Sequence, residues 1–73
     1  MMMRFPKTIV FFEHQGLGTA VKAIAADQPG RVRFQATDWP AKLYRPTPMI
    51  DCDRKVRVVG REGLTLLVVP AEG

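Results

Sequence analysis

The side chains best suited to chemistry are few and lie apart in the sequence. Cys52 could act as a nucleophile, but Asp51 and Asp53 flank it, and their negative charges disfavour the reactive thiolate. Glu13 and His14 could transfer protons, yet a lone histidine beside an apolar run is usually an ordinary surface or packing residue. The chain contains no serine, which excludes a serine nucleophile. We therefore expect no catalytic residue and no enzymatic activity.

Metal and nucleotide sites also lack the residues they need. The sequence has one cysteine and one histidine, too few for a zinc site built from these ligands. Asp51 and Asp53 alone supply too few oxygen ligands for calcium. Gly16-Leu17-Gly18 lacks the third glycine, the lysine and the following helix of a phosphate-binding loop, so it is interpreted as a turn. The sequence predicts no metal and no cofactor.

Exposed aromatic rings beside basic side chains would favour single-stranded nucleic-acid binding. Eleven Lys and Arg against seven Asp and Glu give a net charge of +4, which permits this function without requiring it. Strict alternation, however, places Phe34 on the face opposite Arg31 and Arg33. It likewise places Trp39 opposite Lys42. A nucleic-acid-binding protein is therefore kept as the alternative to the main interpretation.

The outward basic residues and the apolar residues near the N-terminus remain as candidates for contact with a partner. The basic side chains favour a solvated surface that keeps the domain soluble, and otherwise a surface for an acidic protein or anionic lipid. The apolar residues before position 16 must be covered, either by one end of the domain or by a partner. The predicted partner surface consists of Arg31, Arg33, Lys42, Tyr44, Arg57, Arg61, Phe11 and Phe12.

These residues must be positioned by the elements of the fold. The chain consists of short apolar segments separated by Gly, Pro and Asp clusters, a pattern typical of an all-β domain. Strands are predicted at residues 19–25, 30–36, 39–44, 55–61 and 65–69. Thr37-Asp38 is predicted as a tight turn, and the proline-containing residues 45–53 as a long surface connection. The side chains predicted to face inward are Val21, Ala23, Ala25, Val32, Phe34, Ala36, Trp39, Ala41, Leu43, Val56 and Val58.

The length of 73 residues allows one domain. Residues 1–15 are expected as an apolar leader, 16–70 as the domain and 71–73 as a frayed end. Short strands with a break after the third favour a five-stranded Greek-key barrel of the OB type, because closure hides the strand edges. An SH3-like small barrel uses the same number of strands and remains the alternative. No apolar run approaches the ~20 residues of a membrane-spanning helix.

The order of several short motifs over residues 16–70 resembles the NfeD-like C-terminal domain. The motifs are Gly16-x-Gly18-x-Ala20, Pro29-Gly30-Arg31-Val32-Arg33-Phe34, Trp39-Pro40-Ala41, Lys55-Val56-Arg57-Val58-Val59, Gly63 and Leu66-Leu67-Val68-Val69-Pro70. In that family they form successive strands of an OB barrel, with a glycine pair opening the first strand. This chain departs from the family at Ala36-Thr37-Asp38 and Asp53-Arg54, where the family usually has glycine.

The resemblance implies a soluble interaction module, usually tethered to membrane helices, that works with membrane-associated scaffold proteins of the stomatin or flotillin type. The family supplies no catalytic residue for the barrel, and the serine protease activity of its longer members cannot carry over to a chain without serine. Because no spanning segment is present, any membrane tether must come from elsewhere. We expect a cytoplasmic module at the membrane surface, and the sequence indicates no oligomeric state.

Overall fold

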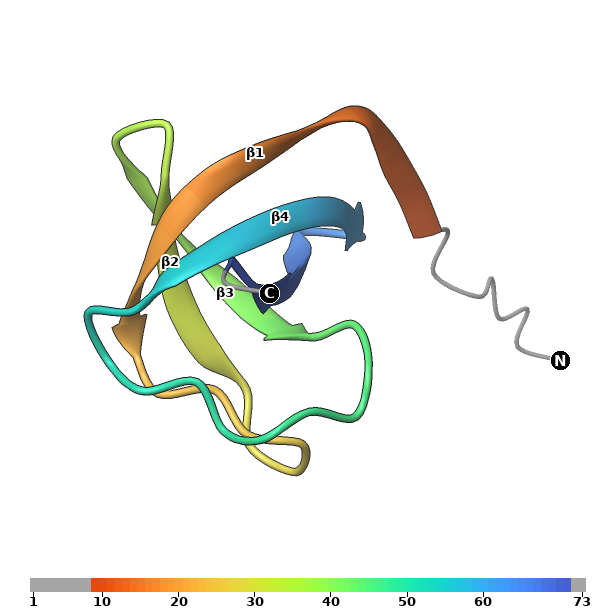
Figure 1. Cartoon of the computed structure of the whole chain (residues 1–73). Coiled ribbons are helices and arrows are strands. Elements are labelled where there is room, and N and C mark those ends of the chain that lie inside the picture. The colour runs from red at the N-terminus through yellow and green to blue at the C-terminus, as the bar shows by residue number, and fades with distance from the viewer. Residues whose placement is uncertain (1–8, 72–73) are drawn as a thin grey trace, which may run out of the picture.

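The computed structural model describes residues 9–71, which form a closed five-stranded barrel (Figure 1). The strands are β1 (Ile9–Lys22), β2 (Gly30–Phe34), β3 (Thr37–Leu43), β4 (Lys55–Glu62) and β5 (Thr65–Pro70). They close in the order β1-β2-β3-β5-β4, and every neighbouring pair is antiparallel except β3 and β5. The described residues contain no helix. This architecture confirms the prediction of an all-β barrel and fits the OB type.

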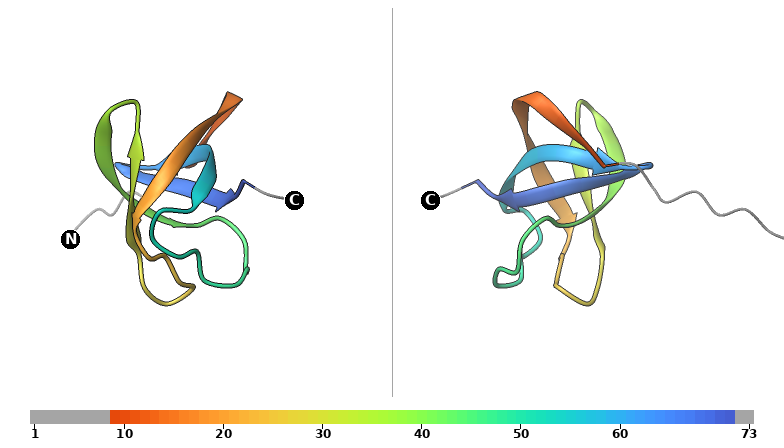
Figure 2. Two further views of the ribbon diagram at one scale, coloured as in Figure 1. Left: turned by 60° about the vertical axis from the view of Figure 1, so that its left-hand side comes forward. Right: turned by 90° about the vertical axis from the view of Figure 1, so that its right-hand side faces the viewer.

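Strand β1 begins ten residues before the predicted position 19 and bends sharply on its way around the barrel (Figures 1 and 2). Ile9–Phe11 pair with Glu62–Gly60 of β4, and pairing with β4 resumes at Gly16 opposite Val58. Residues 12–15 therefore lie opposite Val59 alone, a large bulge that redirects the strand. Of the leader expected at residues 1–15, residues 9–15 thus belong to a strand, and residues 1–8 lie outside the described residues. Gly16-Leu17-Gly18 is paired strand, so its interpretation as a turn was wrong.

The core consists of small and branched apolar side chains from all five strands and the connections between them. The buried residues of this cluster are Ala20, Ile24, Val32, Ala41, Ile50, Val56, Val58, Leu66 and Val68. None of the residues buried within positions 9–71 is charged or polar. Burial of this apolar surface is the main force that stabilises so small a domain.

The inward face predicted for the first strand was wrong. Ala20 and Ile24 are fully buried, whereas Val21 and Ala23 are only half-buried. Alternation places Lys22 on the same face as Ala20 and Ile24. A charged residue on that face predicted that it would point to solvent, so the opposite face was assigned to the core. The register with β2 shifts between Ala20 and Lys22, and this irregularity lets Lys22 reach solvent while Ile24 stays in the core.

The turn between β2 and β3 lies two residues earlier than predicted. Gln35 and Ala36 form it, both with positive φ (55° and 64°), so Ala36 is exposed and does not face inward. Thr37 and Asp38 are part of β3, paired with Phe34 and Arg33. Two consecutive residues with positive φ match the twist of a β-hairpin, although glycine or asparagine usually occupies such positions.

The long connection between β3 and β4 closes one end of the barrel. Figure 1 shows it beside the connection between β1 and β2, away from the bend of β1. Ile50 is buried and exchanges backbone hydrogen bonds of 2.9 Å with Ile24. Asp53, at the end of this connection, has a φ of 71°. Ala36 and Asp53 thus have a left-handed backbone at the two sites where the family that the sequence resembles usually has glycine.

Candidate partner-binding surface

A hollow of about 240 Å³ lies at the end of the barrel beside the bend of β1. Three aromatic residues, Phe12 of β1, Phe34 of β2 and Trp39 of β3, contribute to its lining. Leu66 of β5 and Leu64 of the turn after β4 add aliphatic surface. With Arg61 of β4, all five strands contribute to the hollow, and apolar side chains form most of its wall.

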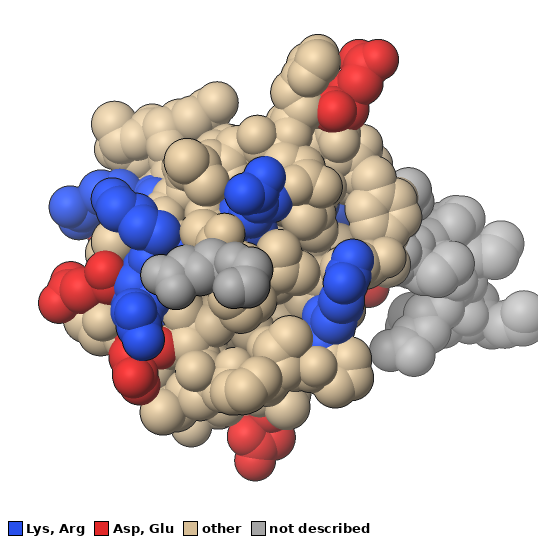
Figure 3. Space-filling view, viewed as in Figure 1, with Lys and Arg blue, Asp and Glu red and all other residues tan. Residues whose placement is uncertain are grey.

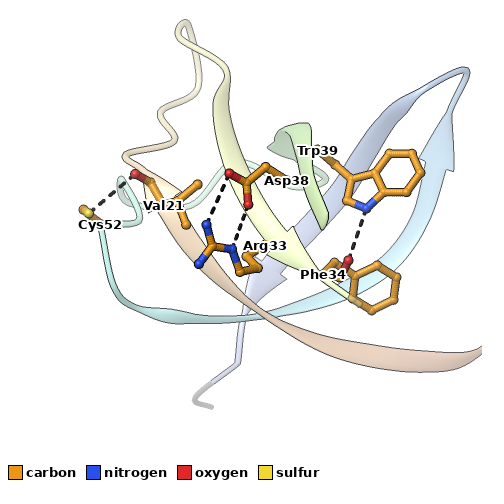
Figure 4. Close-up of polar contacts among 6 residues, drawn as sticks. All are labelled: Val21, Arg33, Phe34, Asp38, Trp39 and Cys52. Atoms are coloured by element: carbon orange, nitrogen blue, oxygen red, sulfur yellow. Dashed lines mark hydrogen bonds and ion pairs between the residues drawn. The ribbon is translucent and has the colours of Figure 1, made fainter. Parts of the chain in front are cut away.

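The rings of Phe34 and Trp39 are held in place by the backbone around them. The indole Nε1 of Trp39 donates a hydrogen bond of 3.2 Å to the carbonyl oxygen of Phe34, across the β2–β3 hairpin (Figure 4). A Cβ at Gly16 would lie 2.4 Å from the ring of Phe34, so only glycine lets this ring pack against β1. Both rings pack against the core but are only half-buried. They were predicted inside the core, and they lie at its edge.

Residues 9–12 form an arm at the start of β1, and this arm is unusually apolar for an exposed strand. Ile9, Val10 and Phe11 are 46%, 38% and 56% exposed. One edge of the arm pairs with β4, where a Cβ at Gly60 would lie 2.3 Å from the carbonyl oxygen of Val10. Pairing with β2 starts only at Thr19, so no strand among residues 9–71 pairs with the other edge of the arm.

Phe11 reaches across the outside of the barrel to Tyr44. Their ring centroids are 5.5 Å apart and their planes meet at 79°, an edge-to-face contact. Arg45 adds a cation–π contact, with its guanidinium carbon 5.8 Å from the centre of the Tyr44 ring. Lys42 forms an ion pair with Glu62, which pairs with Ile9 in the register. Of the predicted partner surface, Phe11 is therefore part of the arm, and Tyr44 and Lys42 lie close to it.

The remaining basic residues of the predicted surface are dispersed. Arg31 and Arg33 are exposed on the outer face of β2, Arg57 on that of β4, and Arg61 at the rim of the hollow. Figure 3 shows the basic side chains of the face in view as separate groups and not as one continuous patch. Of the eight predicted residues, Phe11, Phe12, Lys42, Tyr44 and Arg61 lie around the arm and the hollow.

Arg33 is held by an acidic residue of the neighbouring strand. Its Nε donates a hydrogen bond of 2.9 Å to Oδ1 of Asp38, its partner in the β2–β3 register (Figure 4). The hydrogen bond from Arg33 lowers the pKa of Asp38 below its ordinary value; desolvation opposes this shift, and the positive charges of Arg33 and Arg31 add to it. Arg33 is therefore already partnered within the chain.

Residues considered for catalysis or metal binding do not come together. Cys52 is exposed, and its Sγ lies 3.6 Å from the carbonyl oxygen of Val21 (Figure 4). His14 and Glu13 are exposed in the bulge of β1. Across residues 9–71, no three or more His, Cys, Asp or Glu side chains are grouped so that they could hold a metal ion. The same residues include no helix with the length and hydrophobicity of a membrane span.

Leu64 is an exposed residue of the hollow that the sequence analysis did not select for contact with a partner. It lies in the turn between β4 and β5, is 74% exposed and lines the hollow. A large apolar residue directly after Gly63, in a turn where polar residues are usual, was the available signal. Phe34 and Trp39 were recognised as important but were assigned to the core and not to a surface.

Comparisons with known proteins agree with this picture. The model of the NfeD-like C-terminal, partner-binding domain matches residues 14–70. A solved structure of the C-terminal domain of a stomatin operon partner protein from Pyrococcus horikoshii is 31% identical, with a TM-score of 0.68 over 80% of this chain and 86% of that chain. The soluble domain of a membrane protein implicated in regulation of membrane protease activity, from Corynebacterium glutamicum, is 24% identical, with a TM-score of 0.69 over 75% and 86%. This second likeness supports the fold alone. No curated protein sequence matches the chain.

Proposed function

Because this chain belongs to the family of NfeD-like C-terminal, partner-binding domains, we propose that it is a non-enzymatic module that binds a membrane-associated scaffold protein of the stomatin or flotillin type. Its similarity to a domain described as part of a stomatin operon partner protein supports the stomatin type. Binding to such a protein would place the module at a membrane surface, either through this partner or through a separate tether.

The hollow beside the bend of β1 is the observation that carries the proposal. Its lining contains three aromatic rings and one charged side chain, Arg61, and it includes no carboxylate, thiol or imidazole that could act as a base. Concave apolar surfaces with a few polar groups at the rim are typical of binding sites, and aromatic residues and arginine are enriched at interfaces. The arrangement therefore favours binding over catalysis.

A nucleic-acid platform is less well supported. Stacking needs aromatic faces next to free cationic groups. Trp39 and Phe34 instead pack against the core, whereas Arg31 and Arg33 lie on the outer face of β2. Arg33 is moreover paired with Asp38. These two rings and the arginines of β2 thus lie on different faces of the sheet, as the alternation in the sequence predicted. Arg61 is the basic side chain that lines the hollow with the rings.

The proposal is tested by isothermal titration of the chain with a purified stomatin-type protein, with a single-stranded oligonucleotide as the control. We expect saturable binding to the protein with a negative heat-capacity change, because apolar surface is buried. No binding to the stomatin-type protein would contradict the proposal. Oligonucleotide binding that weakens steeply with salt, and is lost when Arg31 and Arg33 are both replaced by Ala, would establish the alternative instead.

A further inference from the structure

We propose that residues 9–12 of β1 receive an extended segment of the partner as an added β-strand, and that an apolar side chain of this segment enters the hollow. The inference rests on the proposed function and specifies how the same surface would be used. It commits to one kind of occupant, a segment in β conformation that carries a large apolar residue with a carboxylate close to it.

The backbone of the arm has one edge without a neighbouring strand among residues 9–71. Ile9–Phe11 pair with β4 on one side, and on the other side no strand lies beside them among the described residues. In an antiparallel strand, alternate residues direct their N–H and C=O groups to opposite edges, so half of the groups of the arm face this free edge. An open edge is a template for a further strand, and partner segments in other complexes bind in this way.

The arm leads directly into the hollow. Phe12, its last residue, lines the hollow, and Phe11 points to the other side, toward Tyr44. Because side chains alternate along a strand, an added strand would direct every second side chain to the side of Phe12. A partner segment held by the backbone of the arm would thus present one of its side chains to the hollow.

The size and the rim of the hollow define the chemistry of the segment. Its volume of about 240 Å³ exceeds the ~150 Å³ of an apolar cavity that binds benzene, so one large apolar side chain can enter. The guanidinium of Arg61 stands at the rim, exposed, where it donates to the carbonyl oxygen of Gly63 and makes no ion pair within residues 9–71. A carboxylate on the partner would form a charge-assisted hydrogen bond there.

Charge also argues against a second copy of this chain as the occupant. Each copy carries a net charge of +4 and the same cationic group at the rim of the hollow. Pairing of two arms would bring these like charges together. An acidic segment of a different protein removes this conflict.

Two leucines of similar exposure provide the test. Leu64 is 74% exposed at the hollow, and Leu17 is 65% exposed on the outer face of β1, opposite Arg57 in β4. In a titration with the stomatin-type protein, Leu64→Glu is expected to weaken binding at least ~10-fold, because the new carboxylate would lose its hydration against an apolar side chain of the partner. Leu17→Glu, the matched control, is expected to bind like the parent chain. Hydrogen exchange of the amides of residues 9–12 is expected to slow when the partner is bound.

The outcomes separate this inference from the proposed function. Binding that Leu64→Glu and Leu17→Glu leave equally unchanged, or that does not slow exchange at residues 9–12, would overturn strand addition and leave the proposed function standing. Failure of the parent chain to bind the stomatin-type protein would overturn both. Sedimentation that shows a dimer abolished by Val10→Glu would replace the partner segment by a second copy and overturn the inference as stated.

Discussion

The ring of Phe11 contacts the ring of Tyr44 edge-on, with centroids 5.5 Å apart, although one residue lies in the first strand and the other follows the third. Leu67 of β5 lies outside the core cluster yet is only 2% exposed. Leu67 is paired with Gly60, and Gly60 with Phe11, so the two rings have room to cover this outer part of β4 and β5. The arm therefore contributes to a small second apolar cluster outside the barrel.

The ring pair is expected to stabilise the domain measurably. Replacing Phe11 and Tyr44 by Ala, singly and together, should give a coupling free energy of about 0.5–1.5 kcal/mol in urea unfolding, the range found for aromatic pairs. The same cycle with Leu17 in place of Phe11 is the control and should show no coupling, because Leu17 lies opposite Arg57 and has no ring that could contact Tyr44. Additive effects of Phe11→Ala and Tyr44→Ala would mean that the rings do not interact in solution.

Glycine in the left-handed turn between β2 and β3 should stabilise the folded domain. Ala36 has a φ of 64°, which costs an L-residue energy that glycine does not pay. Ala36→Gly should therefore raise the free energy of unfolding by about 0.5–1 kcal/mol, which corresponds to several degrees in Tm for a domain of this size. Ala26→Gly is the matched control, because Ala26 is exposed and is not among the residues with positive φ. It should lower Tm slightly through the entropy of the unfolded chain, and a fall in Tm for Ala36→Gly as well would contradict this turn geometry.

The ion pair between Arg33 and Asp38 should make a small, pH-dependent contribution to stability. The pKa of Asp38 is lowered in the folded state, chiefly by the hydrogen bond from Arg33. The contribution is therefore present above the ordinary pKa of an aspartate, about 4, and is lost as the pH falls through the lower folded value. Asp38→Asn should reduce Tm slightly at pH 7 but not near pH 2, and the difference should shrink in high salt because the pair is exposed. A difference in Tm that persists at pH 2 would point to a cause other than this charge.

The barrel could be predicted because its signals are local and repeated. Alternation placed Val32, Val56 and Val58 in the core, and all three are fully buried. Clusters of Gly, Pro and Asp marked the approximate ends of the strands. The order of the motifs identified the family, which the match over residues 14–70 confirms.

The start of β1 could not be predicted from the same signals. Glu13, His14 and Gln15 interrupt the apolar run, and glycines at 16 and 18 resemble a turn in the sequence. Both glycines are required for a different reason: they allow β2 to pack closely, with Phe34 against Gly16 and Val32 against Gly18. Such a contact between distant segments leaves no local pattern.

The hollow and the arm beside it could be predicted only in part for a similar reason. Phe11, Phe12 and Tyr44 were recognised by their exposed or unpaired apolar character, but the hollow depends on how strands meet at one end of the barrel. Leu64 belongs to it only because the β4–β5 turn lies beside Phe12 and Trp39. Assignment of Trp39 to the core followed correctly from alternation, which indicates the face of a sheet and not the depth along the barrel.

Trp39 provides the most direct test of the central claim, that the hollow is where the partner binds. It is the single tryptophan of the chain and lines the hollow, so its fluorescence reports on this site alone. Titration with a stomatin-type protein labelled so that its own tryptophans do not contribute should shift the emission of Trp39 to shorter wavelength, with the same midpoint as binding measured by calorimetry. Saturable binding that leaves the emission of Trp39 unchanged would contradict the account and place the interface elsewhere on the barrel.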